Sequence, residues 1–482
     1  MPPPDQQIPP TTTSVAPAPI PPSRRLLDAP WINRAKTAAI FTADPWNGLW
    51  GRRPTYWAAC LWCFCVTWPV SIVELAGIPL MLCTALRIHR NWRYIPSILL
   101  QPLLLTVALF GIIQFTSGLW TIDRAQWLEQ SGSIRWLWSL FMLWPLIEHR
   151  RSLILWLAAG ALVGNATQLS QFLHTALGWP TPTWPRAPDR TSGWWPPVVC
   201  GTLLTAILGL HLPALVLPCR PREKILATIA APITLAGILA SGTRGAWLAS
   251  AALLLVSIPL LLVIRARSSA RPSPASPRTR LFVVTGAILA LLAASLIWWK
   301  LGDSLLRRAD LARQEITAAI HTSNYTTDTG ARIGMALWAI DLFRDHPFAG
   351  VGAGSFRPAT QTLLQSRGID PSTQAVHQHA HNALLHIAAT TGLLGLLPAL
   401  AVILIALRNA AHLARDRVPS HGPYEWGPFV ALLGLLFVSA FDAVHINAQT
   451  SALLAVLLSL SPTFIPTTPN GPPPIAATRP PA

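Results

Sequence analysis

About twelve apolar segments, separated by polar loops, constrain this chain more than any other feature of its sequence, since most are long enough for a helix to cross a bilayer. Hydrophobic residues make up 52% of the chain and charged residues 11%, against roughly 25% charged residues in a water-soluble domain. The sequence therefore predicts an all-α polytopic membrane protein with about twelve transmembrane helices, and it excludes a water-soluble globular enzyme.

The apolar segments also define the predicted domain organisation. They are Tyr56–Val70, Ile72–Leu86, Ile95–Thr116, Ser133–Ile147, Ser152–Leu173, Pro196–Leu217, Ile225–Ala240, Ala246–Ile264, Leu281–Trp299, His381–Leu407, Trp426–Val444 and Ile446–Phe464. The first two are short, so a re-entrant pair is an alternative to two spans. We expect a disordered Pro-rich tail over 1–55, helices 1–9 over 56–301, a large loop over 302–380, helices 10–12 over 381–465, and a second disordered tail over 466–482.

The basic residues predict the orientation of these helices. They concentrate in the N-terminal tail and in alternate loops, at 87–93, 150–151, 220–224, 265–280 and 408–417. The positive-inside rule puts these loops in the cytoplasm and the 302–380 loop on the opposite side, because long loops translocate largely regardless of charge. The net charge of +17 is thus a topology signal, and we expect membrane lipids and no nucleic acid as partners.

Two arginines stand at the predicted outer ends of spans in similar surroundings. Arg190 precedes Thr-Ser-Gly, and Arg244 lies in a Ser-Gly-Thr-Arg-Gly turn. An arginine near lipid is costly, so each is expected to have an anionic partner, and the guanidinium fork suits a diphosphate. The alternative is an arginine that reaches out to lipid headgroups.

Three alternate histidines, His377, His379 and His381, end the long loop. Such a pattern could bind a metal, but no cysteine or acidic cluster accompanies it. A neutral imidazole is also the commonest general base, and a polar helix end is the plainest interpretation. Asp442, at the outer end of a later span, could orient the base, pair with an arginine, or form a purely structural ion pair.

Several motifs resemble one bacterial membrane family. His381-Asn382, nine further residues and then Gly392-Leu-Leu-Gly match a pattern of the O-antigen ligases. The segments that begin at Arg332 and at His346 are similar to a loop signature shared by O-antigen ligases, O-antigen polymerases and bacterial protein O-oligosaccharyltransferases. The Arg190 and Arg244 turns resemble the same superfamily. The resemblance covers about Arg190 to Gly395.

The resemblance implies a glycosyltransferase fold of the C type in the bacterial inner membrane, with an active site that faces the periplasm. It implies transfer of a glycan from undecaprenyl-diphosphate without a metal or other cofactor. It assigns the general base to His381, with His379 as the nearest competitor, and the diphosphate to Arg190 and Arg244. Arg332 and Asp442 are further substrate-binding candidates. Developing charge on the leaving diphosphate agrees with these roles.

The acceptor is the least determined part of this prediction. It is lipid A-core for an O-antigen ligase, a growing glycan for a polymerase, and a protein for an O-oligosaccharyltransferase. The short stretch after the last span favours the ligase. A polyprenyl-diphosphate glycan transporter is a further alternative, but internal repeats and charged mid-membrane helices are not evident. The alternating glycines from Gly350 to Gly354 are expected to form a turn that positions the loop, and not a nucleotide-binding loop.

Overall fold

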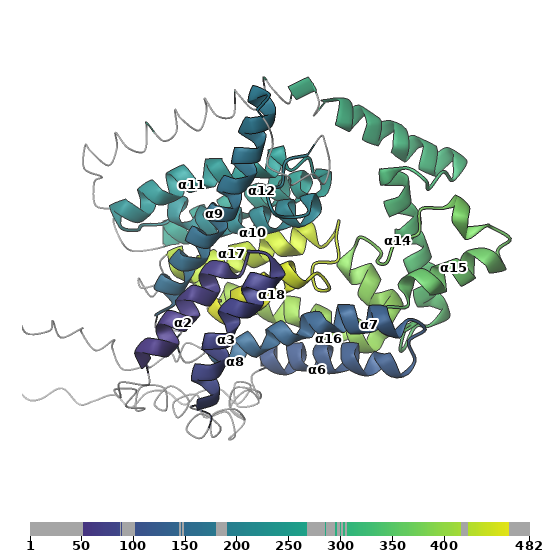
Figure 1. Cartoon of the computed structure of the whole chain (residues 1–482), viewed down its shortest axis with the longest axis horizontal. Coiled ribbons are helices and arrows are strands. Elements are labelled where there is room, and N and C mark those ends of the chain that lie inside the picture. Colours follow the sequence, from purple (N-terminus) through teal and green to yellow (C-terminus); the bar gives the residue numbers. More distant parts are fainter. Residues whose placement is uncertain are drawn as a thin grey trace, which may run out of the picture. The chain divides into compact units, whose positions relative to one another are not determined.

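The computed structural model describes residues 52–86, 102–143, 149–179, 190–267, 306–415 and 423–461, together with 88, 146, 285, 295, 299, 302 and 303. These residues form helices, and no strand occurs among them (Figure 1). The predicted all-helical class is confirmed. Six helical stretches are long and apolar enough to cross a membrane: Pro102–Leu119, Arg150–Thr175, Pro197–Val216, Pro221–Ala240, Arg244–Arg267 and Ala383–Ala411.

Each predicted apolar segment that lies among the described residues is helical. The helices are α2 (Arg52–Cys65), α3 (Val70–Leu86), α6 (Pro102–Thr116), η3 (Gly132–Leu137) with α8 (Trp138–Leu143), α9 (Arg150–Leu177), α10 (Pro197–Val216), α11 (Pro221–Ala240), α12 (Arg244–Arg267), α16 (Ala383–Arg415), α17 (Pro423–Val438) and α18 (Ala448–Leu460). The predicted segment 281–299 and the two tails lie almost entirely outside the described residues. Twelve membrane crossings and a periplasmic loop remain predictions.

Helix α10 forms the centre of the packed helices. It packs against α11, α12 and α17, and almost every residue from Val199 to Pro213 is buried. A glycine permits the closest of these approaches, since a Cβ built on Gly209 would lie 2.6 Å from the carbonyl oxygen of Val430 in α17. A helix that is apolar on all sides is stable only when neighbours or lipid cover it, and here other helices do so.

The helix that follows the predicted histidines is broken. Gly392 interrupts α16 with φ 60° and ψ −157°, and the broken backbone pairs with the 347–352 segment, which lies between α14 (Asp328–Asp345) and α15 (Phe356–Ser366). The hydrogen bonds run from Val351 N to Ala389 O (3.0 Å), from Gly352 N to Thr390 O (2.8 Å), from Leu393 N to Pro347 O (2.8 Å) and from Leu394 N to Phe348 O (3.1 Å). The loop thus supplies the partners that the helix loses at its break.

Glycines make this pairing possible. A Cβ on Gly392 would lie 2.3 Å from the backbone of Phe348, and one on Gly350, where φ is 63°, would lie 2.3 Å from the carbonyl carbon of Thr390. Gly354, with φ 82°, approaches the backbone nitrogen of Trp127 in the same way, at 2.4 Å. Gly350, Gly354 and Gly392 therefore let the segment between α14 and α15 lie directly against α16 and against α7 (Arg124–Ser131).

Candidate active site

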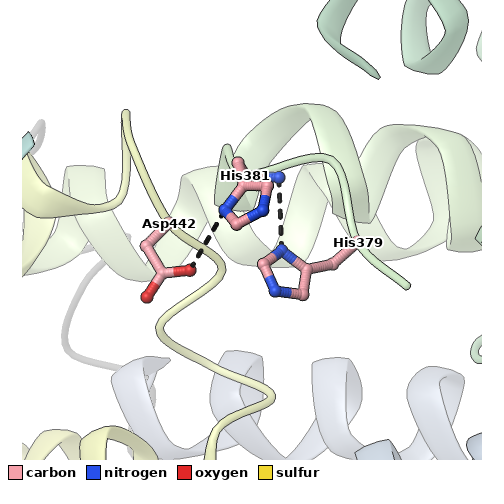
Figure 2. Close-up of side chains that lie close together, drawn as sticks. All are labelled: His379, His381 and Asp442. Atoms are coloured by element: carbon pink, nitrogen blue, oxygen red, sulfur yellow. Dashed lines mark hydrogen bonds and ion pairs between the residues drawn. The ribbon is translucent and has the colours of Figure 1, made fainter. Parts of the chain in front are cut away.

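Three of the predicted residues lie together. Figure 2 shows His379 and His381, from the segment before α16, beside Asp442, from the connection between α17 and α18. His381 Nδ1 is 3.8 Å from Asp442 Oδ1, and the backbone N–H of His381 donates to His379 Nδ1 at 3.3 Å. One ring nitrogen or carboxylate oxygen of each residue lies within 4.8 Å of the others. Residues far apart in the sequence therefore form one polar group, which we call the histidine group.

Asn382 explains why these segments meet. Its side-chain oxygen accepts from the backbone N–H of Leu385 at 3.0 Å and so caps α16, while its amide donates to the carbonyl of Ala440 at 3.3 Å. The backbone N–H of Ala383 donates to the carbonyl of Ser439 at 2.8 Å. The start of α16 is thereby tied to the segment that carries Asp442.

His381 itself adopts a rarely occupied backbone conformation. Its φ is 48°, in the left-handed region that favours glycine. Such a conformation costs about 1 to 3 kcal/mol and persists where surrounding contacts hold it, often at functional sites. The capped helix on one side and the bond to His379 on the other provide those contacts.

The histidines are neutral at pH 7. Burial is the largest cause that lowers the pKa of His381 far below its ordinary value, and the positive charge of Arg332 acts in the same direction. Burial likewise lowers the pKa of His379, although the charge of Asp442 opposes this shift. Each ring therefore keeps a lone pair that can accept a proton. The contact between His381 and Asp442 becomes an ion pair only when the ring is protonated.

Arg332 lies beside this group. It extends from α14 and donates from Nη1 to the carbonyl of Phe441 at 2.9 Å, next to Asp442. Its charge interacts favourably with that of Asp442 and unfavourably with that of Arg244. Arg332 thus connects the histidine group to the turn that carries Arg244.

Arg244 already has an anionic partner in the protein. Its Nη1 donates to Glu315 Oε2 at 3.0 Å and to Thr329 Oγ1 at 2.8 Å. Burial favours the protonated form of Glu315, but hydrogen bonds from Thr329 and Arg244 outweigh it and lower the pKa of this carboxyl. The expectation of an anionic partner for Arg244 is thus met by Glu315 in the structure, 71 residues away in the sequence.

Arg190 packs on the same turn. Its Cγ lies 3.1 Å from the position that a Cβ on Gly242 would occupy, and the guanidinium carbon of Arg308 lies 3.6 Å from that position. Gly242 is two residues before Arg244, so both predicted arginines belong to one turn region, with Arg308 beside them.

Two glutamines of α9 hold this turn region together. Gln168 joins the segment after Arg190 to α11, Gln171 joins that segment to α9, and the segment also pairs directly with the end of α11. The hydrogen bonds run from Gln168 Nε2 to Thr191 O (2.8 Å) and Gly237 O (2.7 Å), from Ser192 N and Gly193 N to Gln171 Oε1 (3.0 and 2.8 Å), and from Thr191 N to Ala240 O (3.2 Å). The positions of the two arginines therefore depend on a helix that carries neither of them.

The sequence did not reveal Glu315 and His386 as members of this region, and it indicated His445 only as a neighbour of Asp442 without a role. The ring of His386 lies 6.4 Å from that of His379 and 5.8 Å from that of His445. His386 is buried and His445 half-buried, and neither ring nitrogen of either one has a hydrogen-bond partner. Their spacing from His381 and Asp442 was the one available signal.

An apolar cavity of about 210 Å³ begins next to these histidines. It lies between α6, α16, α17 and α18, and its lining is almost entirely hydrocarbon. Ala383, Ser439 and His445 line it near the start of α16, while Leu407 and Leu458 line it near the ends of α16 and α18. Its shape and chemistry suit an extended hydrocarbon chain.

Comparison with known families identifies this stretch of the chain. The sequence model of the O-antigen ligase family matches residues 229–400, from α11 into α16. This confirms the resemblance to the O-antigen ligase and polymerase superfamily, whose members are glycosyltransferase-like enzymes that act on lipid-linked glycans. Arg244, Arg332, His379 and His381 lie inside the matched stretch, and Arg190 and Asp442 lie outside it. No curated protein matches the chain.

Proposed function

We propose that this protein transfers a glycan from undecaprenyl-diphosphate to lipid A-core at the periplasmic face of the bacterial inner membrane. The match of residues 229–400 to the O-antigen ligase family supports this proposal. One observation carries the proposal. The histidine of the family motif, His381, lies in a strained conformation beside Asp442, and its Nδ1 has no hydrogen-bond partner. A strained backbone conformation held by its surroundings often occurs at a functional site, and a ring nitrogen without a partner leaves the side chain free to take part in proton transfer.

His381 acts as the general base in this proposal. Its Nδ1 faces Asp442, so Nδ1 carries the proton of the neutral ring and Nε2 keeps the lone pair. Nε2 takes the proton from the acceptor hydroxyl while that oxygen bonds to the anomeric carbon and the bond to the diphosphate breaks. Asp442 then stabilises the imidazolium, as a carboxylate does beside other catalytic histidines.

The arginines bind the leaving diphosphate in this mechanism. Arg190 and Arg244 belong to one turn region, and Arg332 lies close enough to interact electrostatically with both Arg244 and His381. Arg332 is among the causes of the low pKa of His381. A bound diphosphate would offset this positive charge and raise the pKa of His381, so binding of the donor makes the base stronger when it is needed.

Glu315 sets a condition on this arrangement. It occupies one Nη of Arg244, so the diphosphate binds through the remaining donors or displaces the carboxylate. In either case Glu315 holds the guanidinium in place while the donor is absent. The apolar cavity beside His445 supports a lipid-linked substrate, because it offers hydrocarbon-lined space next to the reacting groups.

Acceptor discrimination tests the proposal. Purified protein receives a polyprenyl-diphosphate glycan together with lipid A-core, a second glycan, or a pilin protein, and the glycosylated product is identified. We expect transfer to lipid A-core, absent in His381→Ala. Transfer only to the second glycan would indicate a polymerase, and transfer only to pilin would indicate a protein O-oligosaccharyltransferase. Absence of transfer to any acceptor would refute the proposed enzymatic activity.

Reporter fusions test the topology on which the proposal depends. Fusions within residues 302–380 are expected to report the periplasm and fusions within residues 268–277 the cytoplasm, because basic residues alternate between loops. A periplasmic signal at Ser269 would put Arg190 and Arg244 on the wrong side of the membrane.

A further inference from the structure

We propose that His379, His381 and Asp442 also form a binding site for a first-row transition-metal ion such as Zn²⁺, and that a bound ion inhibits glycan transfer. The binding itself is argued from the geometry of the three side chains. Only the inhibition rests on the proposed function.

The three side chains are close to the spacing of a metal site. A tetrahedral zinc ion, with bonds of about 2.0 to 2.1 Å, holds its ligand atoms about 3.3 Å apart. His381 Nδ1 and Asp442 Oδ1 are 3.8 Å apart, and the His379 ligand atom lies within 4.8 Å of both (Figure 2). Small side-chain rotations therefore suffice to bring three ligands to one ion.

The donor atoms are available for an ion. His381 Nδ1 has no hydrogen-bond partner, and Asp442 Oδ1 accepts, among the described residues, only the backbone N–H of Ala443, at 2.9 Å, so one of its lone pairs is free for an ion. An ion bound at His379 Nδ1 replaces the 3.3 Å hydrogen bond from the backbone of His381 and links the same two residues through their side chains. The left-handed backbone of His381 and the cap at Asn382 hold the histidines in place before any ion arrives.

The type of ligand selects the type of ion. Two imidazoles and one carboxylate suit Zn²⁺, Co²⁺, Ni²⁺ or Cu²⁺, whereas Mg²⁺ and Ca²⁺ prefer oxygen ligands. With three protein ligands, the fourth position stays open to water. The nearby charge of Arg332 opposes a cation, so we expect reversible binding and not the permanent retention of a structural zinc.

A bound ion removes the base that transfer needs. When His381 Nδ1 binds the ion, the single proton of the neutral ring must sit on Nε2. Nε2 then has no lone pair with which to accept the proton of the acceptor hydroxyl. Asp442 is occupied by the same ion and no longer stabilises an imidazolium.

Direct metal binding is the first test. Purified full-length protein is treated with EDTA, freed of the chelator and titrated with Co²⁺, whose visible spectrum reports tetrahedral coordination; Zn²⁺ then competes. We expect one ion per chain. His379→Ala and Asp442→Asn are each expected to weaken binding at least about 10-fold, the scale on which even outer-shell partners act.

His377→Ala is the matched control, because its ring lies 5.4 Å from that of His381 but outside the three ligands. It is expected to bind Co²⁺ as the unaltered protein does. Thermal melting selects folded variants, and His379→Gln replaces His379→Ala if the latter does not fold. Absence of saturable binding, or equal affinity in His379→Ala, Asp442→Asn and the control, would refute the metal site.

Transfer assays test the inhibition separately. Zn²⁺ is expected to stop transfer by the metal-free protein, and EDTA to restore it. Unchanged transfer with Co²⁺ or Zn²⁺ bound would refute the inhibition but not the metal site. Absence of transfer in metal-free protein would refute the proposed function, whereas the Co²⁺ spectrum would still establish the site.

Discussion

Two partly buried polar groups in this protein differ in their ion pairing, although each contains an atom without a hydrogen-bond partner, Arg151 Nε in the first and His381 Nδ1 in the second. At the starts of α9, α11 and α17, Arg151 donates to Glu223, which also accepts from the backbone N–H of Arg220 at 3.2 Å, and the guanidinium lies 5.4 Å from the ring of Tyr424. In the histidine group, His381 Nδ1 has no hydrogen-bond partner. His386 and His445 behind it have none at either ring nitrogen.

We interpret this difference as one between a structural ion pair and a group that takes part in chemistry. The Arg151–Glu223 pair joins two helices through opposite charges, whereas the neutral histidines form no ion pair and leave ring nitrogens unpaired. Burial alone would not distinguish the two regions. We therefore expect changes in the Arg151 group to alter stability and changes in the histidine group to alter chemistry.

The sharpest test of this contrast is His381→Ala. We expect glycan transfer to fall by about 10² to 10⁴-fold, the usual scale of a lost general base, while folding and carrier binding stay largely intact. Single-turnover transfer measures the loss. His377→Ala is expected to cost far less, and transfer by the unaltered protein is expected to persist in EDTA. Near-normal transfer by His381→Ala would move the base to His379 or remove it from the mechanism.

Arginine-to-lysine substitutions extend the contrast to the turn region. We expect Arg190→Lys and Arg244→Lys each to lose about 30- to 1000-fold in transfer, or about 2 to 4 kcal/mol of transition-state stabilisation, because lysine lacks the guanidinium fork. Glu315→Gln is the matched variant, since it removes the carboxylate and keeps Arg244. It is expected to retain transfer. Lysine variants with normal turnover and carrier affinity would show that the arginines only contact headgroups.

Glu223→Gln tests the other side of the comparison. It is expected to destabilise the protein by about 1 kcal/mol, because Arg151 is 40% exposed and solvent screens the pair. Transfer per folded molecule is expected to stay unchanged. Thermal melting and an activity assay on the same preparation measure both quantities. A large loss of transfer without a change in melting would give the Arg151 group a chemical role.

The pH profile has the smallest expected effect. Burial lowers the pKa of His379 and His381 below 6.5, so both rings stay neutral as the pH falls through 6.5. Transfer measured as kcat/KM is therefore expected to be nearly flat from pH 8 to 6.5 and to decline only below it. An acid limb centred above pH 6.5 would contradict the buried, neutral base.

Hydropathy predicted the long apolar helices, but not α7, α14 and α15, which are too polar to be recognised as spans; the last two lie within the predicted loop 302–380. The motif around His381 and the position of Asp442 at the end of a span singled out three side chains that the structure brings together, and their chemical role stays a prediction. Glu315 was not predictable, since its contact with Arg244 joins residues 71 apart that share no pattern. His386 was missed because a lone histidine within an apolar run looks like any other polar residue of a span, whereas His445 was recognised only as a neighbour of Asp442 at the end of a span.

The glycine motif that contains Gly392 is a second case in which the sequence did not predict a contact between distant segments. The spacing of Gly392 was recognisable as a pattern, but its physical reason is the backbone of Phe348, 2.3 Å from where a Cβ would be. Sequence spacing records that a small residue is needed. It does not record which distant segment needs the space.

The break at Gly392 also bears on how deep in the membrane the reaction occurs. Residues 393–411 rise about 28 Å as a helix, close to the thickness of about 30 Å of the hydrocarbon layer. If residues 393–411 cross that layer, the nine residues of α16 before the break add about 13 Å of helix at its edge, where lipid headgroups lie. His381 would then lie at the depth of the lipid headgroups, where the diphosphate of a carrier lipid also lies. The donor would reach the base without its charged diphosphate entering the hydrocarbon layer.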